Sequence, residues 1–291
     1  MKPLLIHVHI FYPYLWTEIK KCLQNIDRFD YDLFITMVEN YESIRFDILE
    51  AFPKAQIEIV ENRGYDVGPF IDILNKVRLE DFSYVIKLHT KRNMRPGSRL
   101  KMYNMTAGRW RKYALHFLSS ANNFRLCCQA FIDNEKLGMI SNYHLIFNGD
   151  IEDDDPKAYS QALIYLHKLG FSDVPSTFVA GTMFMCKANL LSPLKKLNLT
   201  LNSFDIPDRN KPTTVAHALE RLMGMLVVAQ HYEIQDCVSS AFKQKIYESN
   251  VAFQIRKILR FFFNHTINSR GQEIIRICRI PISVDVFHKD K

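Results

Sequence analysis

The chain begins with a regular alternation of short apolar runs and longer segments that have helical periodicity. Runs of strand length recur at residues 4–10, 31–38, 57–60 and 84–88, and helical segments lie between them at 14–26, 43–52 and 69–77. Four strands separated by three helices favour a parallel sheet, because right-handed crossover helices usually connect parallel strands. We therefore predict the α/β class: a Rossmann-like, mostly parallel sheet with flanking helices.

The alternation weakens after residue 89. It predicts a helix at 110–118, a short strand at 137–140, and a strand-like run over 177–185 that is interrupted at Gly181. A glycine inside a strand marks either a bulge or a position where another group approaches the backbone closely. Both interpretations stay open at this point.

A further helix is predicted from residue 213 to residue 222, with a threonine near its cap. His217 lies three residues before Glu220 and four before Arg221, so the three side chains can share one helix face. Glu220 follows an apolar stretch, and the alternative to a site residue is a carboxylate that pairs with neighbouring charges on a solvated helix face.

Polar residues follow the predicted strands where each strand ends. The ligand crevice of a parallel sheet lies beyond the carboxyl ends of its strands, and N–H groups at a strand-to-helix junction attract anions. The residues at these ends are Glu39, then Asn62, Arg63, Gly64 and Asp66, and then His89, Lys91 and Arg92. We expect them to converge on one edge and bind a ligand. The alternatives are that His89 is a structural histidine and that Asp66 only caps the following helix.

The formal net charge of +7 is unevenly distributed along the chain. Residues 242–291 carry ten Lys or Arg against four Asp or Glu, and residues 82–132 carry ten basic residues and no acidic one. An acid-free stretch of that length suggests a polyanionic ligand. The alternative is a solvated basic face that is balanced by acidic residues from elsewhere in the fold.

The segment 251–264 has the pattern of a basic amphipathic helix. Arg256, Lys257 and Arg260 lie on one helical face, apolar residues lie on the other, and three consecutive phenylalanines occupy 261–263. This composition is typical of a helix at an anionic membrane surface, and packing on the preceding domain is the alternative. We predict a domain over 1–241 and a helical basic tail over 242–291. No motif supports a nucleic-acid partner.

The six cysteines show no CxxC spacing, which indicates reduced thiols rather than a disulfide framework. The sequence shows no signal-peptide pattern and no apolar run of the length that spans a bilayer. We therefore expect a cytoplasmic protein that is attached peripherally to the inner face of the cell membrane.

Five blocks of residues stand out, in order, at 61–70 (ENRGYDVGPF), 84–91 (YVIKLHTK), 110–111 (WR), 178–184 (FVAGTMF) and 217–222 (HALERL). Together they resemble the motifs of the rhamnan synthesis protein F family. The resemblance implies glycosyl transfer in the assembly of bacterial surface polysaccharides. More distantly, the layout is similar to the A-type nucleotide-diphospho-sugar glycosyltransferase fold.

The resemblance implies a nucleotide-diphospho-sugar donor and a glycan or lipid-linked glycan acceptor. Glu220 stands where related A-type enzymes carry the catalytic carboxylate, and Asp66 and His217 are the alternative catalytic residues. Gly181 and Thr182 are expected near the donor or acceptor sugar. The expected activity is transfer of a rhamnose-like deoxyhexose by an inverting glycosyltransferase. The alternative is a non-catalytic, transferase-like scaffold in a polysaccharide synthesis complex.

The chain departs from the A-type pattern at the metal position. His89-Thr90-Lys91 offers no carboxylate where such enzymes usually place an Asp-x-Asp site for a divalent ion. We therefore predict no metal site, and expect Lys87, Lys91 and Arg92 to neutralise the leaving diphosphate. A second departure is Lys211-Pro212, where the family often has Asp-Gly.

Overall fold

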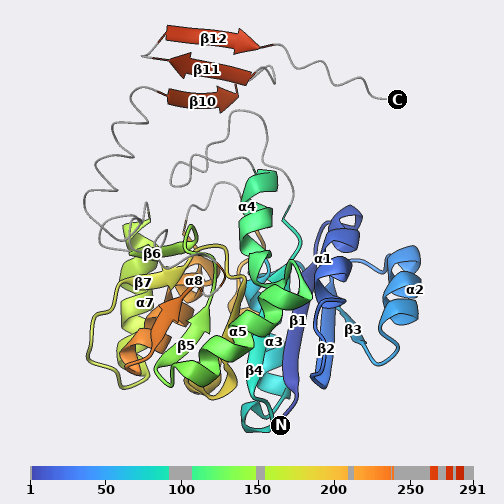
Figure 1. Cartoon of the computed structure of the whole chain (residues 1–291). Coiled ribbons are helices and arrows are strands. Elements are labelled where there is room, and N and C mark those ends of the chain that lie inside the picture. Colours follow the sequence, from blue (N-terminus) through green and yellow to red (C-terminus); the bar gives the residue numbers. More distant parts are fainter. Residues whose placement is uncertain are drawn as a thin grey trace. The chain divides into compact units, whose positions relative to one another are not determined.

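The computed structural model describes residues 2–91, 107–148, 155–208, 213–236 and 238, together with three strands between residues 263 and 284. The chain forms two compact units. The first comprises residues 1–91 and 111–238, and the second comprises 92–110 and 239–291. Figure 1 shows the elements of both. The boundary expected at residue 241 stays a prediction.

The first ninety residues form the predicted parallel strands. They are β1 (Leu4–Ile10), β2 (Tyr31–Met37), β3 (Gln56–Ile59) and β4 (Tyr84–His89). β1 pairs in parallel with both β2 and β4, and β2 pairs in parallel with β3. The carboxyl ends of all four strands therefore lie at the same edge of the sheet.

Three further strands complete a seven-stranded sheet in the order β3-β2-β1-β4-β8-β5-β9. β8 (Phe184–Lys187) is antiparallel to its neighbours β4 and β5 (Leu137–Ile140), whereas β9 (Glu233–Gln235) is parallel to β5. The sheet is therefore mostly parallel, and the predicted α/β class is confirmed.

The strand-like run 177–185 is divided between two sheets. Its first part is β7 (Thr177–Val179), which pairs with β6 (Ile146–Asn148) in a separate two-stranded antiparallel sheet. Its last part belongs to β8 in the main sheet. The chain passes from one sheet to the other through a turn at Gly181, where the backbone φ is 85°. Glycine adopts this left-handed conformation without a Cβ clash.

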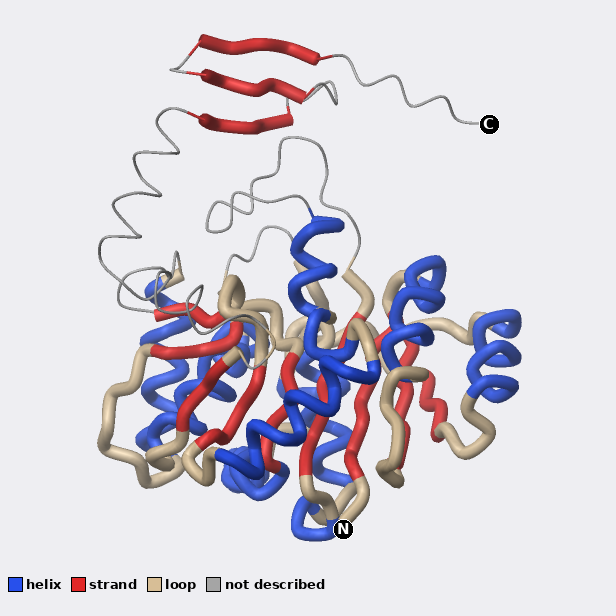
Figure 2. Tube along the Cα trace, in the orientation of Figure 1, coloured by secondary structure: helices blue, strands red, loops and turns tan. Residues whose placement is uncertain are grey.

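Helices lie on both faces of the main sheet (Figures 1 and 2). α1 (Trp16–Leu23) and α2 (Glu42–Ala51) follow β1 and β2, and α1 buries Trp16, Ile19 and Leu23 along one helical stripe. α3 (Val67–Lys76) leads from β3 to β4, which lies on the other side of β1. Because crossovers are right-handed, this reversal places α3 on the opposite face of the sheet.

The remaining helical elements are η1 (Pro13–Leu15), η2 (Leu79–Asp81), α4 (Ala107–Ala114), η3 (His116–Leu118), α5 (Ala121–Asp133), α7 (Pro156–Lys168), η4 (Ala188–Leu197), η5 (Leu201–Ser203) and α8 (Val215–Ala229). Neither α5 nor α7 was expected from the sequence pattern. α5 buries Phe124, Cys127 and Phe131 at helical spacing behind a Ser120 cap, and Asp155 caps α7. These local signals are present in the sequence and favour helices at both places.

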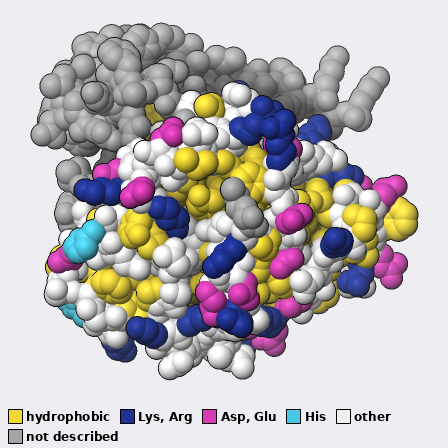
Figure 3. Space-filling model, turned by 60° about the horizontal axis from the view of Figure 1, so that its bottom comes forward, with side chains coloured by type: hydrophobic (Ala, Val, Ile, Leu, Met, Phe, Trp, Pro, Cys, Tyr) yellow, Lys and Arg dark blue, Asp and Glu magenta, His cyan; other side chains and the backbone are white. Residues whose placement is uncertain are grey.

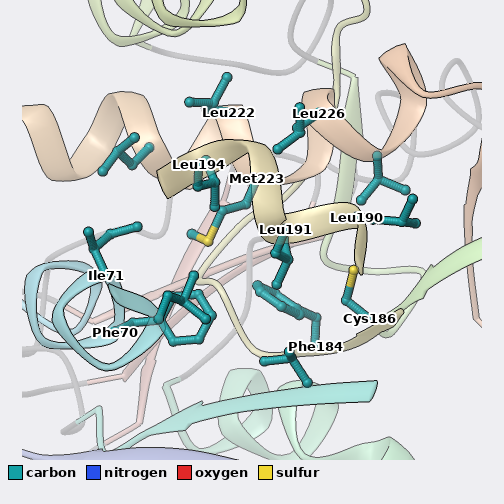
Figure 4. Packing of buried hydrophobic residues seen from close by; sticks show 14 of the residues in the cluster. Phe70, Ile71, Phe184, Cys186, Leu190, Leu191, Leu194, Leu222, Met223 and Leu226 are labelled. Carbon is teal, nitrogen blue, oxygen red and sulfur yellow. The ribbon is translucent and has the colours of Figure 1, made fainter. Parts of the chain in front are cut away.

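One apolar core packs α3, η4 and α8 against β8 (Figure 4). Phe70 of α3, Phe184 of β8 and Leu191 of η4 are each at most 1% exposed. Leu222 and Met223 of α8 belong to the same cluster. Burying one side chain of this size stabilises a fold by about 1.5–3 kcal/mol. The core therefore fixes α3 and α8 relative to the sheet, and these two helices begin at its carboxyl edge.

Three basic residues of the acid-free stretch pair with acidic residues that lie elsewhere in the sequence. Lys87 pairs with Asp66, Arg111 Nε lies 2.8 Å from the Glu18 carboxylate, and Arg125 Nε lies 3.7 Å from Asp27. On the face shown in Figure 3, basic and acidic side chains are interspersed with apolar patches. Part of the charge run is therefore balanced within the fold, as the alternative interpretation expected.

The second unit contains a three-stranded antiparallel sheet of β10 (Phe263–Ile267), β11 (Glu273–Ile277) and β12 (Ile280–Val284). Most of the predicted basic helix, residues 251–262, lies outside the described residues. Its last two positions, Phe263 and Asn264, belong to β10 and are extended rather than helical. Among the helices that the structure describes, none has both the length and the apolar character needed to cross a bilayer.

Candidate active site at the carboxyl edge of the sheet

A buried ion pair lies at the start of α3. Lys87 of β4 is 0% exposed, and its ammonium pairs with Asp66 Oδ2 and donates to Thr182 Oγ1 at 2.7 Å. The centroid of the Phe70 ring lies 5.4 Å from Lys87 Nζ, which is a cation–π contact. Thr182 Oγ1 in turn donates to Asp66 Oδ2 at 2.6 Å. Asp66 therefore joins β4 to the turn between β7 and β8.

The charge of this cluster follows from its burial and its partners. Burial opposes ionisation of Asp66, but His89, Lys87 and the Thr182 hydroxyl together hold the pKa of Asp66 well below its usual range. Burial also lowers the pKa of Lys87, and the neighbouring Asp66 carboxylate opposes that shift. The pair is therefore a mutually dependent unit, because each charge offsets the desolvation of the other.

His89 connects the same cluster to Gly181. Its Nε2 donates to the Gly181 carbonyl at 2.8 Å, and its Nδ1 lies 3.6 Å from Asp66 Oδ1. Burial lowers the pKa of His89 to about 4, with Asp66 opposing the shift. The imidazole is therefore neutral near pH 7 and carries its proton on the nitrogen that faces Gly181.

The turn between β7 and β8 has an unusual backbone. Gly181 has a φ of 85° and Thr182 a φ of 55°, so two consecutive residues are left-handed. For a β-branched residue such as Thr182 this conformation is strained and persists only when the surrounding contacts hold it. Here the contacts are the hydrogen bonds of the Thr182 hydroxyl and the Gly181 peptide.

Glu220 lies in the second turn of α8, facing this turn. Its Oε1 accepts a hydrogen bond from the Gly181 N–H at 2.5 Å, and its Oε2 accepts one from Arg221 Nη1 at 3.1 Å. The Arg221 guanidinium lies 5.1 Å from the Phe178 ring, which fixes it in turn. The Glu220 side chain remains 20% exposed. The carboxylate is therefore oriented by two donors and still accessible to a ligand.

His217 takes part in the cap of α8. Its Nδ1 accepts a hydrogen bond from the Thr214 N–H at 3.3 Å and lies 2.9 Å from Thr214 Oγ1, which forms a capping box. The His217 ring also contacts the Tyr65 ring edge-on, with centroids 5.5 Å apart. One ring nitrogen of His217 is thus committed to holding the helix start.

The loop after β3 is anchored to residues 204–205. Arg63 Nη1 donates to the Phe204 carbonyl at 3.2 Å, and the Gly64 N–H donates to the Asp205 carbonyl at 3.0 Å. Gly64 has a φ of 66°, and a Cβ there would lie 2.4 Å from the Phe204 ring. Tyr65 is also left-handed, with a φ of 56°, and is 37% exposed beside His217.

The structure brings together six of the predicted site residues: Asp66, Lys87, His89, Gly181, Thr182 and Glu220. Glu39 is exposed just after β2, and Asn62 and Lys91 are half-buried. Arg92 and the Lys211-Pro212 pair lie outside the described residues. The roles of all these residues in binding and catalysis stay predictions.

The segment after β4 does not fit a divalent metal site of the A-type kind. His89 is bound to Gly181, and Thr90 Oγ1 accepts hydrogen bonds from the N–H groups of Phe11 and Tyr12, both at 2.9 Å. No carboxylate occurs in residues 82–132, although carboxylate oxygens are the usual protein ligands of such an ion. In the part of the chain that the structure describes, no group of three or more His, Cys, Asp or Glu side chains is arranged to hold a metal.

With this geometry in place, comparison with known proteins gives the family. The model of the family described as "Rhamnan synthesis protein F" matches residues 1–232. The chain belongs to the rhamnan synthesis protein F family. The resemblance carried by the five sequence blocks is therefore confirmed.

Individual proteins that are similar to this rhamnan synthesis protein F family member share less than a third of the aligned residues with it. Two proteins named "Uncharacterized protein WxcX", from Xanthomonas campestris pv. campestris strains B100 and ATCC 33913, are each 29% identical over 189 residues. The match covers 62% of this chain but 25% of theirs, so the chain spans a quarter of their length. The crystal structure of S. aureus TarS 1–349 aligns at 10% identity with a TM-score of 0.39, covering 82% of this chain and 59% of that one.

Three buried polar residues of the family member were not among the predicted site residues. The Thr36 hydroxyl lies 3.0 Å from both His7 Nε2 and His9 Nδ1, on neighbouring strands β2 and β1. Burial lowers the pKa of His7 well below its usual range and that of His9 to about 3. His7 and His9 stand at alternate positions of an otherwise apolar strand, so both point to the same face of the sheet. This spacing could have identified them from the sequence.

Proposed function

We propose that this member of the rhamnan synthesis protein F family is a glycosyltransferase. It transfers a rhamnose-like deoxyhexose from a nucleotide-diphosphate donor to a growing, lipid-linked surface glycan. The observation that carries the proposal is the Glu220 carboxylate, which is accessible yet fixed by the Gly181 N–H and Arg221 at the carboxyl edge of the sheet. Family membership over residues 1–232 supports glycosyl transfer, and the word rhamnan in the family's description is the reason for proposing a rhamnose-like donor.

In the proposed reaction Glu220 acts as the general base. It removes the proton from an acceptor hydroxyl, whose oxygen then attacks the anomeric carbon of the donor sugar. The bond between that carbon and the diphosphate oxygen breaks on the opposite side, so the anomeric configuration is inverted. The diphosphate leaves with the bonding electron pair. A positioned general base contributes about 10²–10⁴-fold to such a rate.

Cationic side chains neutralise the leaving diphosphate in this proposal. Lys91 and Arg92 follow shortly after β4, and residues 82–132 contain no carboxylate that could hold a divalent ion in their place. Lys87 is already bound by Asp66 and Thr182, so contact with the diphosphate would require breaking that ion pair. We therefore assign the diphosphate to Lys91 and Arg92, while Asn62 and Glu39 bind the nucleotide or sugar.

The acceptor places the reaction at a membrane. A lipid-linked glycan keeps its growing end near the bilayer, and the basic segment 242–291 supplies cations that are attracted to anionic lipid. We propose that the protein works in the cytoplasm at the inner face of the cell membrane. Full-length protein should co-sediment with vesicles containing anionic lipid, less so at high salt, and not with neutral vesicles. Equal sedimentation with both kinds of vesicle would contradict this localisation.

The test of the proposed activity is a screen of purified protein against nucleotide-diphospho-sugars, with release of the nucleotide diphosphate as the readout. We expect turnover with at least one deoxyhexose donor, and a loss of about 10²–10⁴-fold in Glu220→Gln. Glu50→Gln, which changes an exposed carboxylate on α2, is the matched control and should retain full turnover.

Two outcomes would contradict the proposal. Absence of turnover and of thermal stabilisation with every donor would favour the scaffold alternative. Full turnover in Glu220→Gln would remove the assigned base. Addition of a chelator tests the metal-free mechanism separately, because turnover should survive it; loss that Mg²⁺ or Mn²⁺ restores would overturn that part.

A further inference from the structure

We propose that the Asp66–Lys87 ion pair and the Thr182 hydroxyl are positioning groups, which hold the Gly181 peptide so that its N–H orients the Glu220 carboxylate. The inference rests on the proposed function for the role of Glu220. It assigns Asp66 and Lys87 to the support of the base rather than to contact with the nucleotide or diphosphate.

The first observation is that the Gly181 residue is held through both of its polar backbone atoms. Its N–H donates to Glu220 Oε1 at 2.5 Å, and its carbonyl accepts from His89 Nε2 at 2.8 Å. The donor for Glu220 is thus a backbone group whose direction depends on the conformation of the turn. A change in φ at Gly181 or Thr182 would turn the N–H away from the carboxylate.

The second observation is that this turn does not adopt its conformation by local preference. Thr182 has a φ of 55°, which the crowded Cβ of a β-branched residue disfavours. Its hydroxyl accepts from Lys87 at 2.7 Å and donates to Asp66 at 2.6 Å, which uses both of its hydrogen-bonding roles. These two bonds oppose relaxation of the turn.

The third observation concerns the buried charges themselves. Lys87 is fully buried, and Asp66 Oδ2 is occupied by both the ammonium and the hydroxyl. A buried ion pair contributes little net stability compared with well-packed apolar residues, so stability alone does not account for it. Holding a strained turn in one conformation requires directional bonds, which this pair supplies and apolar side chains cannot.

The test is a double-mutant cycle between the turn and the base. Thr182→Ala removes the hydroxyl, whereas Thr182→Ser retains it and is the matched control. We expect Thr182→Ala to lower kcat about tenfold while the donor KM changes by less than about twofold, and Thr182→Ser to retain most of kcat. In the Glu220→Gln background, Thr182→Ala should have no further effect, because both changes act through one group.

Two kinetic outcomes would overturn the inference. An equal loss of kcat in both backgrounds would show that Thr182 acts independently of Glu220. A raised donor KM with unchanged kcat would show that Thr182 binds the ligand directly instead.

Hydrogen exchange at the Gly181 amide separates this inference from the proposed activity. In protein labelled with ¹⁵N-glycine, the Gly181 amide should be protected in the unmodified chain and in Thr182→Ser, and should exchange at least about tenfold faster in Thr182→Ala and in Glu220→Ala, which removes the acceptor. This readout needs no turnover, so protection without transferase activity would reject the proposed function and keep the positioning role. Unchanged exchange in Thr182→Ala would reject the positioning role alone.

Discussion

Helix α3 lies over two buried regions of opposite character. Along its length Phe70, Ile71 and Leu74 enter the apolar core with η4 and α8, whereas Asp66, just before its first turn, enters the charged cluster of Lys87 and Thr182. The core is held by packing, and the cluster is held by charges and directional hydrogen bonds. The core can therefore be repacked with little loss, while the cluster depends on each of its members.

The difference shows that apolar packing holds the elements of this fold together, whereas the charged cluster sets the direction of individual polar groups. Apolar contacts fix how far two elements lie apart, but they do not set the direction of a peptide N–H. The cluster lies at the carboxyl edge of the sheet, beside Glu220, and there the direction of the Gly181 N–H matters. The following changes test this contrast between the two regions.

The largest effect is expected for Lys87→Met. Removing the ammonium leaves Asp66, whose side chain is only 15% exposed, without its counter-charge, and breaking a largely buried pair in this way lowers the free energy of unfolding by about 3–5 kcal/mol. Urea denaturation followed by circular dichroism measures the change. A loss below about 1 kcal/mol would show that solvent reaches the carboxylate and that the cluster is not a buried unit.

In the apolar core, Leu191→Ala should lower the free energy of unfolding by about 2–5 kcal/mol, because the residue is fully buried and its removal leaves a cavity. Leu191→Met is the control and should lose less than about 1.5 kcal/mol. Turnover per folded molecule should be unchanged in both variants. Lower turnover at full folding would show that the core also contributes to orienting the site.

Acid should destabilise the protein through the buried histidines. Folded His9 and His89 have pKa values of about 3 and about 4, below the value of about 6.5 for an unfolded histidine. As the pH falls below 6.5 the unfolded state binds protons that the folded state does not. Each histidine therefore lowers the free energy of unfolding by up to about 1.4 kcal/mol per pH unit until its folded pKa is reached.

The histidine assignment is checked by the pH dependence of urea unfolding between pH 7 and pH 4. The slope of the unfolding free energy against pH measures how many protons are bound on unfolding. His9→Gln should reduce this number by one, whereas His167→Gln, which changes an exposed histidine of α7, should leave it unchanged. A slope that is the same in His9→Gln and in the unmodified protein would mean that His9 is protonated in the folded state. Protonation of Asp66, with its lowered pKa, would add a further loss only below pH 3.8.

The smallest of these effects is expected at Gly64. Gly64→Ala places a Cβ 2.4 Å from the Phe204 ring, and the residue has a left-handed backbone that disfavours a side chain. The loop must therefore shift, which should lower the free energy of unfolding by about 1–3 kcal/mol. Gly170→Ala is the matched control, because its φ is 91° but no atom lies within 4 Å of the new Cβ. Thermal unfolding should show a larger loss of stability for Gly64→Ala than for Gly170→Ala. Equal losses would mean that the contact with Phe204 does not restrict the loop.

The main sheet and the position of the site were predictable from local patterns. Apolar runs predicted the four parallel strands, whose carboxyl ends lie at one edge of the sheet as expected. That the polar residues there bind a ligand stays a prediction. The run 177–185 was predicted as one interrupted strand, because no local sequence feature shows that its two parts join different sheets. In the tail, alternation of Phe263, His265 and Ile267 has the period of a strand, yet the preceding residues have helical spacing.

The connections within the site were less predictable than its location. Asp66 and Lys87 are 21 residues apart and meet only because β4 lies beside β1 under α3. Thr182 joins them from 116 residues away from Asp66, through a turn between two sheets. Sequence patterns identify residues at strand ends, but pairing among them depends on the register and order of strands. The sequence therefore suggested ligand contacts where the structure places an internal network.

The central claim is that the buried cluster serves the site rather than stability. Its most direct test is the double variant Asp66→Leu with Lys87→Met, which replaces the pair by apolar side chains of similar size. The account predicts that this variant is at least about 1.5 kcal/mol more stable than Lys87→Met alone, because no unpaired charge remains, yet transfers sugar at less than about a tenth of the original rate. Full transfer by a stably folded double variant would contradict it.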